Sequence, residues 1–483
     1  MFKFVDLFAG IGGFRNALVS LGGQCVGFSE IAPDAIRTYC DNGAETEKDN
    51  LGDIRKLESL PEHDFMTAGV PCQSWSIAGR NLGFDDDRGQ LWNDTLYLLN
   101  KSRPKAFIFE NVKGLSDPRN KDALDYIKAR IELAGYHAHF YVLNAYDYGV
   151  PQARVRIYII GFRDKEFFDK FALPEQTPGE VRLCDVIDGM PHVESHSEKS
   201  RFSLSAGKFN DYFIFNDIRD GDTTIHSWDI ADTTEKEKRI CRLLMANRRK
   251  KKYGKLDGNP LSLEHFAELD GSITQSDIDS LVSKGILKTV KYKYEVLTEA
   301  PLDDDEGAII LDKAAVNDWM INYDELKVDR DVRKKKLNVK KTLAMLETMG
   351  IVKCVERRYD FRNTKISTGI DGIYRIFLPS SNIFSTLVAS DTNDYIATEQ
   401  VEADTLEEYR EKFIRDIFLA KKFRRISKAE ACRIQGFPDD MKMPENRARW
   451  MKLIGNSVAV KLVRKLAKAV VDTGVFGPRE SCF

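Results

Sequence analysis

The order of apolar and polar positions predicts short strands and helices near the N-terminus. Residues 3–8 form an apolar run with strand character, and residues 15–21, after a glycine-rich turn, have a helical pattern. A second strand is predicted to end at Glu30, and a later one spans residues 157–162. Strand, glycine turn and helix in this order predict a nucleotide-cofactor site, because glycines let backbone N–H groups approach an anionic ligand.

Two helices are predicted near the C-terminus. The first starts at Ser427, which forms a capping-box pattern with Glu430, and it stops at Gly436. An apolar-periodic helix is expected to open at Ile454 and to continue to about Val471. The short first helix is assigned a structural role and no chemistry.

The middle of the chain, residues 164–422, has a different pattern. Helices are predicted over residues 235–247, 261–269 and 274–284, and a strand with alternating polarity spans residues 290–296. Three helices and a strand ribbon indicate a winged-helix-like module over about residues 235–298. A further helix–strand pair is expected between residues 339 and 361, and no repeat is obvious.

In helix-turn-helix modules the last helix usually enters the major groove of DNA. Here that helix carries Asp277 and Asp279, which argues against simple phosphate contact. A DNA-binding role and a role as scaffold or dimer contact therefore both stay open. In the second helix–strand pair, Arg357, Arg358, Arg362 and Asn363 are interleaved with aromatic residues, which suits contact with base edges and backbone.

Composition excludes several classes of protein. The 483 residues suffice for two domains, and a formal net charge of −2 means that any affinity for DNA would need local patches. Basic runs at residues 247–255 and 333–341 qualify, although a solvated helix face is the favoured interpretation of either run alone. The eight cysteines contain no Cys-x-x-Cys pair, so neither a metal site nor a disulfide framework is expected. No signal-like or membrane-spanning run is present, which predicts a cytoplasmic protein.

A cysteine on a turn and a Glu-Asn pair at the end of an apolar run predict chemistry on a pyrimidine ring. Carbon 5 of cytosine becomes nucleophilic only after addition to carbon 6, and the thiolate of Cys72 suits this addition. A carboxylic acid, here Glu110, must protonate ring nitrogen 3 at the same time. Asn111 would orient the glutamate or bond the base. A lone Pro-Cys-Gln could equally contain a buried cysteine, so the prediction depends on the pair.

Together with the glycine turn and both C-terminal helices, these motifs resemble the DNA (cytosine-5)-methyltransferase family of bacterial restriction–modification systems. The resemblance implies an α/β fold: a Rossmann-like S-adenosylmethionine-dependent domain that is discontinuous, over residues 1–163 and 423–483. Residues 164–422 would form a large mixed α/β target-recognition domain. The implied partner is double-stranded DNA, and a restriction endonuclease would belong to the same system.

The resemblance also implies roles for individual residues. The catalytic residues would be Pro71, Cys72, Gln73, Glu110, Asn111, Arg154 and Arg156. The cofactor S-adenosylmethionine would be bound by Asp6, Phe8, Ala9, Gly10, Ile11, Gly12, Gly13, Glu30, Ile31, Asp53, Ile54, Asn456, Ser457 and Val458. DNA contacts are expected from Arg88, Arg357, Arg358, Arg362 and Asn363, and residues 74–90 would form a lid that closes over DNA. Family members often have an aromatic residue where this chain has Ile31, which weakens one stacking contact.

Three alternative functions fit parts of this pattern. A tRNA cytosine methyltransferase would share the catalytic motifs, but the long middle segment is hard to explain there. A non-catalytic DNA-binding regulator would retain the fold, although every motif residue is intact. The chain could also need a partner subunit in order to methylate.

Overall fold

The computed structural model describes residues 1–71, 90–193, 212–215, 224–298, 305–362, 370, 372–381 and 383–477. The chain forms two compact units, each of which packs around its own apolar residues. Unit 1 comprises residues 1–213 and 375–483, and unit 2 comprises residues 214–374. The sequence analysis placed the boundaries between a catalytic and a DNA-reading part at residues 163 and 423. The assignment of these two functions to the two parts stays a prediction.

The centre of unit 1 is a six-stranded sheet in the order β2-β1-β3-β4-β6-β5. Its strands are β1 (Phe2–Leu7), β2 (Gly23–Ser29), β3 (Phe65–Gly69), β4 (Ala106–Val112), β5 (His137–Asn144) and β6 (Val155–Phe162). The first four strands are parallel, whereas β6 runs antiparallel to both of its neighbours. The carboxyl ends of the first four strands therefore share one edge with the amino end of β6.

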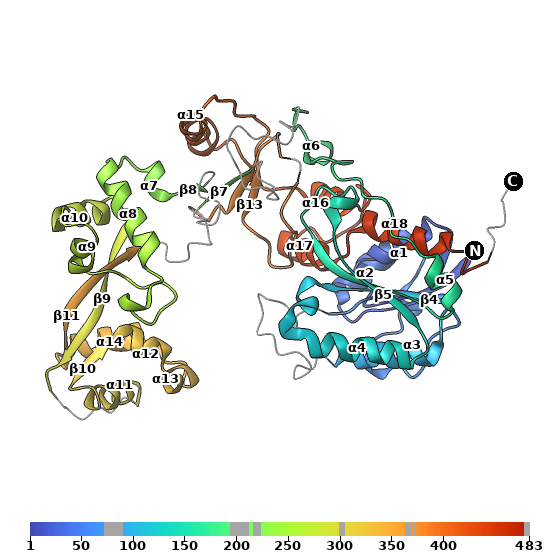
Figure 1. The fold of residues 1–483 in the computed structure, drawn as a ribbon, viewed down its shortest axis with the longest axis horizontal. Helices are drawn as coiled ribbons and strands as arrows, with labels where there is room; N and C mark the ends of the chain where they lie inside the picture. The colour runs from blue at the N-terminus through green and yellow to red at the C-terminus, as the bar shows by residue number, and fades with distance from the viewer. Residues whose placement is uncertain are drawn as a thin grey trace. The chain divides into compact units, whose positions relative to one another are not determined.

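Helices cover both faces of this sheet (Figure 1). The helices of unit 1 are α1 (Gly13–Val19), α2 (Pro33–Asp41), α3 (Leu91–Ser102), α4 (Lys121–Leu133), α5 (Lys165–Lys170), α6 (Leu183–Val186), α15 (Leu406–Lys412) with a π-helical turn (Phe413–Leu419), α16 (Lys428–Gln435), α17 (Arg447–Asn456) and α18 (Val460–Asp472). Trp92 of α3 and Ile127 of α4 are buried in the core of one face, and Leu18 of α1 packs with Leu466 of α18 in the other. The predicted Rossmann-like arrangement is confirmed.

The predicted helix from Ile454 to Val471 is wrong in one respect, because two helices meet there. Helix α17 ends at Asn456, and α18 starts only at Val460. Ser457 between them has an extended backbone, and its carbonyl oxygen accepts hydrogen bonds from the side chains of Arg154 and Gln435. The carbonyl group therefore takes no part in helical hydrogen bonds, and the helix is interrupted here although the apolar pattern of the sequence is continuous.

Two further strands of unit 1, β12 (Arg375–Phe377) and β13 (Asp394–Ile396), pair in parallel. Between them, Phe384 exchanges backbone hydrogen bonds with the segment Pro151–Ala153 just before β6. This contact fastens the C-terminal part of the chain to the edge of the sheet where β6 begins. Across the described residues, no helix has the length and apolarity needed to cross a membrane.

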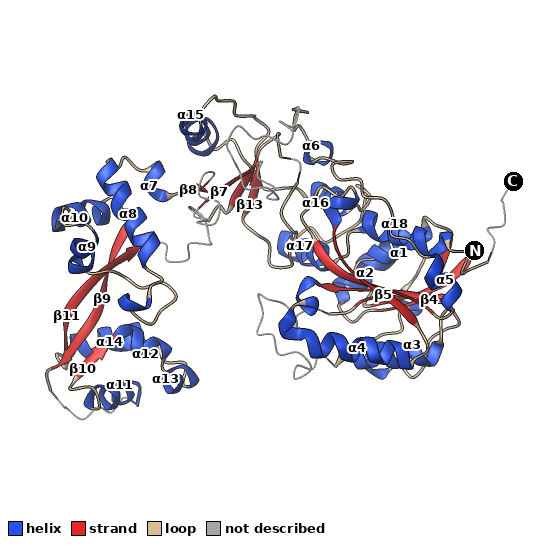
Figure 2. Cartoon of the chain, in the orientation of Figure 1, coloured by secondary structure: helices blue, strands red, loops and turns tan. Residues whose placement is uncertain are grey.

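Unit 2 is built around a long antiparallel ribbon of β9 and β11 (Figure 2). Its helices are α7 (Ser227–Ile230), α8 (Glu235–Asn247), α9 (Leu263–Leu269), α10 (Gln275–Ser283), α11 (Asp305–Ala315), α12 (Tyr323–Val328), α13 (Arg330–Lys334) and α14 (Val339–Thr348). Its strands are β7 (Tyr212–Phe215, which begins in unit 1), β8 (Thr224–Ile225), β9 (Leu287–Val296), β10 (Met320–Asn322) and β11 (Val352–Phe361). The helices and strand predicted between residues 235 and 298 are confirmed, as is the later helix–strand pair.

Candidate active site

The proposed proton donor lies next to the strand that leads to the proposed nucleophile. Gly69, the last residue of β3, is paired with Glu110 of β4. The Asn111 side chain donates a hydrogen bond to the carbonyl oxygen of Val70 over 3.2 Å, which fixes the chain just before Pro71. Cys72 and Gln73 follow directly in the sequence, but they lie outside the described residues, as do Arg88 and the proposed lid.

Glu110 is buried and is held by one cation. The Arg156 Nε atom lies 3.1 Å from Glu110 Oε1, and both side chains are largely shielded from solvent. The Oε1 atom has no hydrogen-bond donor among the described residues, so the contact is an ion pair without an aligned hydrogen bond. A buried carboxylate oxygen without a donor is available to exchange a proton with a ring nitrogen.

The glycine turn after β1 has the backbone shape that a cofactor site requires. Phe8, Gly10 and Gly12 all have positive φ angles, of 51°, 55° and 84°. A left-handed Phe8 is unusual for a side chain of that size, and such conformations gather at functional sites. A Cβ atom added to Gly10 would meet no atom within 4 Å, so the turn borders open space.

The same turn is packed against the C-terminal motif. A Cβ atom on Gly13 would lie 2.6 Å from Val458 Cγ2 and 3.0 Å from Ser457 Oγ. Only glycine therefore lets α1 approach this closely. The neighbouring Ala9 and Ile11 are buried, whereas Asn456 is exposed at the end of α17. The structure thus brings the first and last predicted cofactor motifs together.

A network of hydrogen bonds connects the turn to the end of β2. The Glu30 carboxylate accepts from the backbone N–H groups of Gly10, Ile31 and Ala32 over 2.8–3.0 Å. Asn50, which the sequence analysis did not single out, accepts from the Glu30 N–H and donates to its carbonyl oxygen. The side chain of Ile31 itself is exposed.

Of the two predicted cofactor-binding residues Asp53 and Ile54, Asp53 is paired with a neighbouring side chain. Both carboxylate oxygens of Asp53 accept hydrogen bonds from the Arg55 guanidinium, which lowers the pKa of Asp53. The backbone N–H of Arg55 also donates to Asp53, which caps the short turn that begins at Ile54. Ile54 is buried. An adenine amine would share the Asp53 carboxylate with Arg55.

Asp6 is completely buried at the end of β1. Burial raises the pKa of this carboxyl to about 8, although a hydrogen bond from Thr67 and the nearby Arg15 charge oppose the shift. Its Oδ2 atom has no hydrogen-bond partner among the described residues. Asp6 thus holds the strand beneath the glycine turn and offers no surface to a ligand.

Arg154 and Gln152 join segments that are far apart in the sequence. The Arg154 guanidinium donates to the carbonyl oxygens of Leu387, Gly455 and Ser457. Gln152 donates to the side chain of Gln435, which donates in turn to Ser457 O. The sequence analysis assigned no part in the site to Gln435. The only indication of its role in the sequence was a polar residue at the end of a predicted helix.

The predicted DNA-contacting arginines of unit 2 differ in how free they are. Arg358 is paired with Glu356 at 2.5 Å, donates to the carbonyl oxygen of Tyr253 and stacks on the ring of Tyr292. Arg357 and Arg362, by contrast, are exposed. Asn363 lies outside the described residues.

Comparison with known proteins agrees with this geometry. The family profile of C-5 cytosine-specific DNA methylases matches residues 2–472. The chain belongs to this family. The methylase is 39% identical over 493 residues to Type II methyltransferase M.HgiCII of Herpetosiphon aurantiacus, across 99% of this chain and 98% of that protein. It is 38% identical to M.HgiBI of the same organism, across 98% of both chains.

A more distant relative matches a smaller part of the methylase. Type II methyltransferase M.BanI of Aneurinibacillus aneurinilyticus is 36% identical over 330 residues, which cover 60% of this chain and 75% of that protein. The methylase is an enzyme that methylates carbon 5 of cytosine in DNA, and S-adenosylmethionine is its methyl donor. The turn at Gly10 fits such a cofactor, because it borders open space beside the carboxylate of Glu30, which is held in place by the Gly10 N–H.

Proposed function

We propose that the methylase acts on a flipped-out cytosine in one short duplex sequence through a covalent adduct with Cys72. The observation that carries this proposal is the buried Glu110 carboxylate, which is paired across the sheet with the strand that leads to Cys72. A stacked cytosine cannot reach a site at the edge of a sheet, so extrusion from the duplex, at about a few kcal/mol, precedes the reaction.

The proposed reaction begins at carbon 6. The Cys72 thiolate forms a bond to carbon 6 while Glu110 gives a proton to nitrogen 3, so that electron density shifts to carbon 5. Carbon 5 would take up the electrophilic methyl group that S-adenosylmethionine supplies, as the bond from that methyl group to the donor's sulfur breaks and nitrogen 3 returns its proton to Glu110. Water then removes the proton of carbon 5, the bond to Cys72 breaks, and the aromatic ring is restored with the thiolate released.

Several described residues support these steps without touching carbon 5. Arg156 holds the Glu110 carboxylate in place, and Asn111 holds the Val70 carbonyl, which would accept from the exocyclic amine of cytosine. Arg154 is a positioning residue, because its guanidinium joins three backbone carbonyls instead of facing open space. Asp6 is likewise a positioning residue, beneath the turn that would carry the cofactor.

The proposed cofactor contacts follow from the open side of the glycine turn. Backbone N–H groups near Gly10 and Gly12 would meet the charged end of S-adenosylmethionine, Glu30 its ribose, and Asp53 with Ile54 its adenine. Phe8, Ile31 and the Asn456–Val458 segment complete the set. Arg88, Arg357, Arg362 and Asn363 are proposed to contact DNA, with Arg357 better placed than the internally paired Arg358.

The biological setting is proposed from the relatives' names. M.HgiCII and M.HgiBI are called Type II methyltransferases, which fits an enzyme that protects host DNA from a restriction endonuclease of the same system. A protective enzyme of this kind must modify one defined sequence throughout a genome.

The proposal is tested by bisulfite sequencing of DNA from cells that express the chain. Wild-type protein should leave cytosine unconverted in one short sequence context, and Cys72→Ala should abolish this protection while binding duplex DNA. A matched control is Cys40→Ala, which removes a half-buried thiol outside the proposed site. Protection that survives Cys72→Ala would overturn the covalent mechanism, and protection in no context at all would overturn the DNA specificity.

A further inference from the structure

Unit 2 contains an internal repeat that the sequence analysis did not detect. Helix α10 leads through Gly285 into β9, and α14 leads through Gly350 into β11. The two glycines have φ angles of 71° and 70° and lie 65 residues apart. In both turns the following isoleucine N–H donates to the carbonyl oxygen five residues earlier, at Leu281 and Leu346. The two helix ends are thus the same structural motif.

The rest of each half repeats as well. Ile278 and Leu281 of α10 are buried at positions that correspond to Leu343 and Leu346 of α14. A short extended segment precedes the second helix in each half: Leu261 bridges to β11 before α9, and β10 pairs with β9 before α12. Each half therefore has the helix–strand–helix–helix–strand order of a winged helix, with the short helix α13 added in the second half, and the two halves share one ribbon (Figure 2).

The two halves differ in charge at the position where a winged helix meets DNA. Residues 330–341, which end in the first turn of α14, contain seven basic residues and one acidic residue. The equivalent residues 265–276, which lead into α10, contain two acidic residues and no lysine or arginine. At this position, therefore, the second half offers a polyanion a strongly positive face, and the first half does not.

The side chains of the two helices are also differently engaged. On α10, Gln275 donates to Asp279 and Tyr359, and Asp277 is paired with Lys236. On α14, Lys340 and Lys341 are exposed and make no ion pair with any described residue. Helix α10 has no lysine or arginine, and its Gln275 and Asp277 side chains are bonded to other described residues of unit 2, whereas α14 presents two lysines without such a partner.

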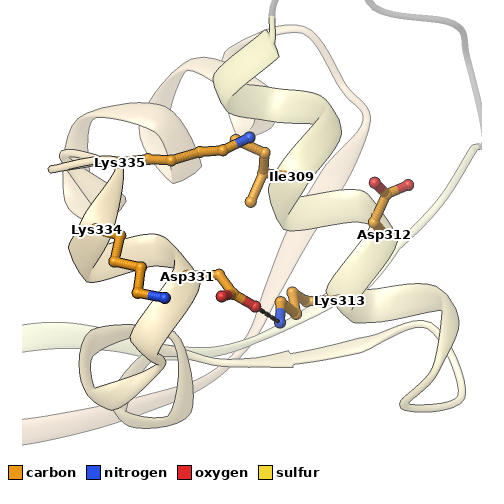
Figure 3. Close-up of a pocket in the computed structure, with 6 residues that line it drawn as sticks. All are labelled: Ile309, Asp312, Lys313, Asp331, Lys334 and Lys335. Carbon is orange, nitrogen blue, oxygen red and sulfur yellow. Dashed lines mark hydrogen bonds and ion pairs between the residues drawn. The ribbon is translucent and has the colours of Figure 1, made fainter.

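The lysines of the basic turn before α14 likewise form no ion pair with a described residue. Figure 3 shows the hollow of about 330 Å³ between α11 and α13, where Lys313 pairs with Asp331. Lys334 and Lys335 line the same hollow without an ion pair to a described residue. The one acid of this stretch is therefore neutralised by Lys313 of α11, which leaves the positive charge of residues 333–341 uncompensated.

We propose that α14 and the basic turn at residues 330–341 form a DNA-contacting element of unit 2 in addition to the arginines on and after β11, and that α10 is its internally packed counterpart. This inference rests on the proposed function, because it assumes that unit 2 reads the substrate. It assigns the groove-facing role to the second half of the repeat, where Lys340 and Lys341 would meet phosphates. Ala344, Met345 and Thr348, which are exposed on the same helix, would face base edges.

The test compares two variants of the full-length protein that each remove two lysine charges. K340Q/K341Q changes α14, and K250Q/K251Q changes two exposed lysines of the first half. Binding to a mixed-sequence 30-base-pair duplex is measured by fluorescence anisotropy between about 50 and 200 mM salt. Each lost phosphate contact lowers the slope of log Kd against log salt by about 0.9.

K340Q/K341Q is expected to lower that slope by about 2, so that the wild type loses roughly tenfold more affinity than the variant across this salt range. K250Q/K251Q should leave the slope unchanged, and both variants should bind S-adenosylmethionine and melt as the wild type does. An unchanged slope in K340Q/K341Q, or an equal loss in both variants, overturns the assignment to α14. If instead the wild type shows no salt-dependent duplex binding, the proposed function itself fails.

Discussion

The burial and the ion pair of Glu110 support its proposed role as the proton donor to nitrogen 3 of cytosine. Among the described residues, its buried Oε1 atom has no hydrogen-bond donor, and Arg156 forms an ion pair with it. Glu110→Gln keeps the size of the side chain but cannot protonate nitrogen 3. We expect kcat of the folded variant to fall by about 10²–10⁴-fold, because general acids contribute factors of this size. Single-turnover methylation measures the loss, and Glu132→Gln on the exposed face of α4 is the control. A kcat near that of the wild type would remove Glu110 from the mechanism.

The buried carboxyl of Asp6 is expected to make the free energy of unfolding depend on pH. Burial raises the pKa of this carboxyl to about 8, well above its value of about 4 in the unfolded chain. Between these values the folded state binds more protons than the unfolded state, so stability falls as pH rises through this window.

The variant Asp6→Asn removes this ionisation while it keeps the shape of the side chain. Relative to the variant, the wild type should lose about 1.4 kcal/mol of unfolding free energy per pH unit between about pH 5 and pH 7. Urea denaturation at several pH values measures the difference, and Asp122→Asn on the surface of α4 controls for general charge effects. Parallel curves for the wild type and Asp6→Asn would show that Asp6 ionises normally.

At the scale of elements, the buried amides of Gln152 and Gln435 hold the catalytic edge together. Gln152 reaches both Gln435 of α16 and the N–H of Leu387, and Gln435 reaches Ser457 at the break between α17 and α18. Gln152→Leu leaves two buried groups without partners and should destabilise the protein by about 2–4 kcal/mol.

A double-mutant cycle tests whether the two amides act as one unit. Gln152→Leu combined with Gln435→Leu should cost clearly less than the sum of the two single changes, because each single change already breaks the shared bond. Chemical denaturation of the four proteins gives the coupling energy. Strict additivity would mean that the amides act independently and that the catalytic edge is held by backbone contacts alone.

The elements also show which features the sequence could predict. Capping boxes and apolar periodicity located α8 and α16 to within a residue, since these signals are local. The break at Ser457 was missed because its cause is a contact from Arg154, some 300 residues away. The repeat in unit 2 was missed because α10 and α14 share spacing and burial but few identical residues.

Among the candidate site residues, some neighbours could be expected from the sequence and others could not. Glu110, Asn111 and Arg156 lie together as the motifs implied, because strand pairing places them at one edge. Two ion pairs, Asp53 with Arg55 and Arg358 with Glu356, could not be predicted. Their formation depends on side-chain rotamers and on neighbours that the fold brings close. The role of Asn50 in holding Glu30 was missed for the same reason.

For the whole molecule, the discontinuity of unit 1 makes a prediction about folding. All six strands of its sheet lie before residue 163, yet one face of that sheet is covered by α18 and the neighbouring C-terminal helices. A fragment of residues 1–213 should therefore expose the apolar side chains of Phe14 and Leu18 and fail to fold stably.

A chain in which a Gly/Ser linker replaces residues 214–374 restores that core, because it keeps both segments of unit 1. We expect it to fold and to bind S-adenosylmethionine, but to lose methylation of its target sequence together with the proposed DNA-reading surface of α14. Thermal melts and calorimetric titration with the cofactor compare folding and cofactor binding of residues 1–213 with those of the linked chain. Bisulfite sequencing measures methylation. Cofactor binding by residues 1–213 alone would show that the C-terminal helices are dispensable, whereas sequence-specific methylation by the linked chain would place target recognition within unit 1.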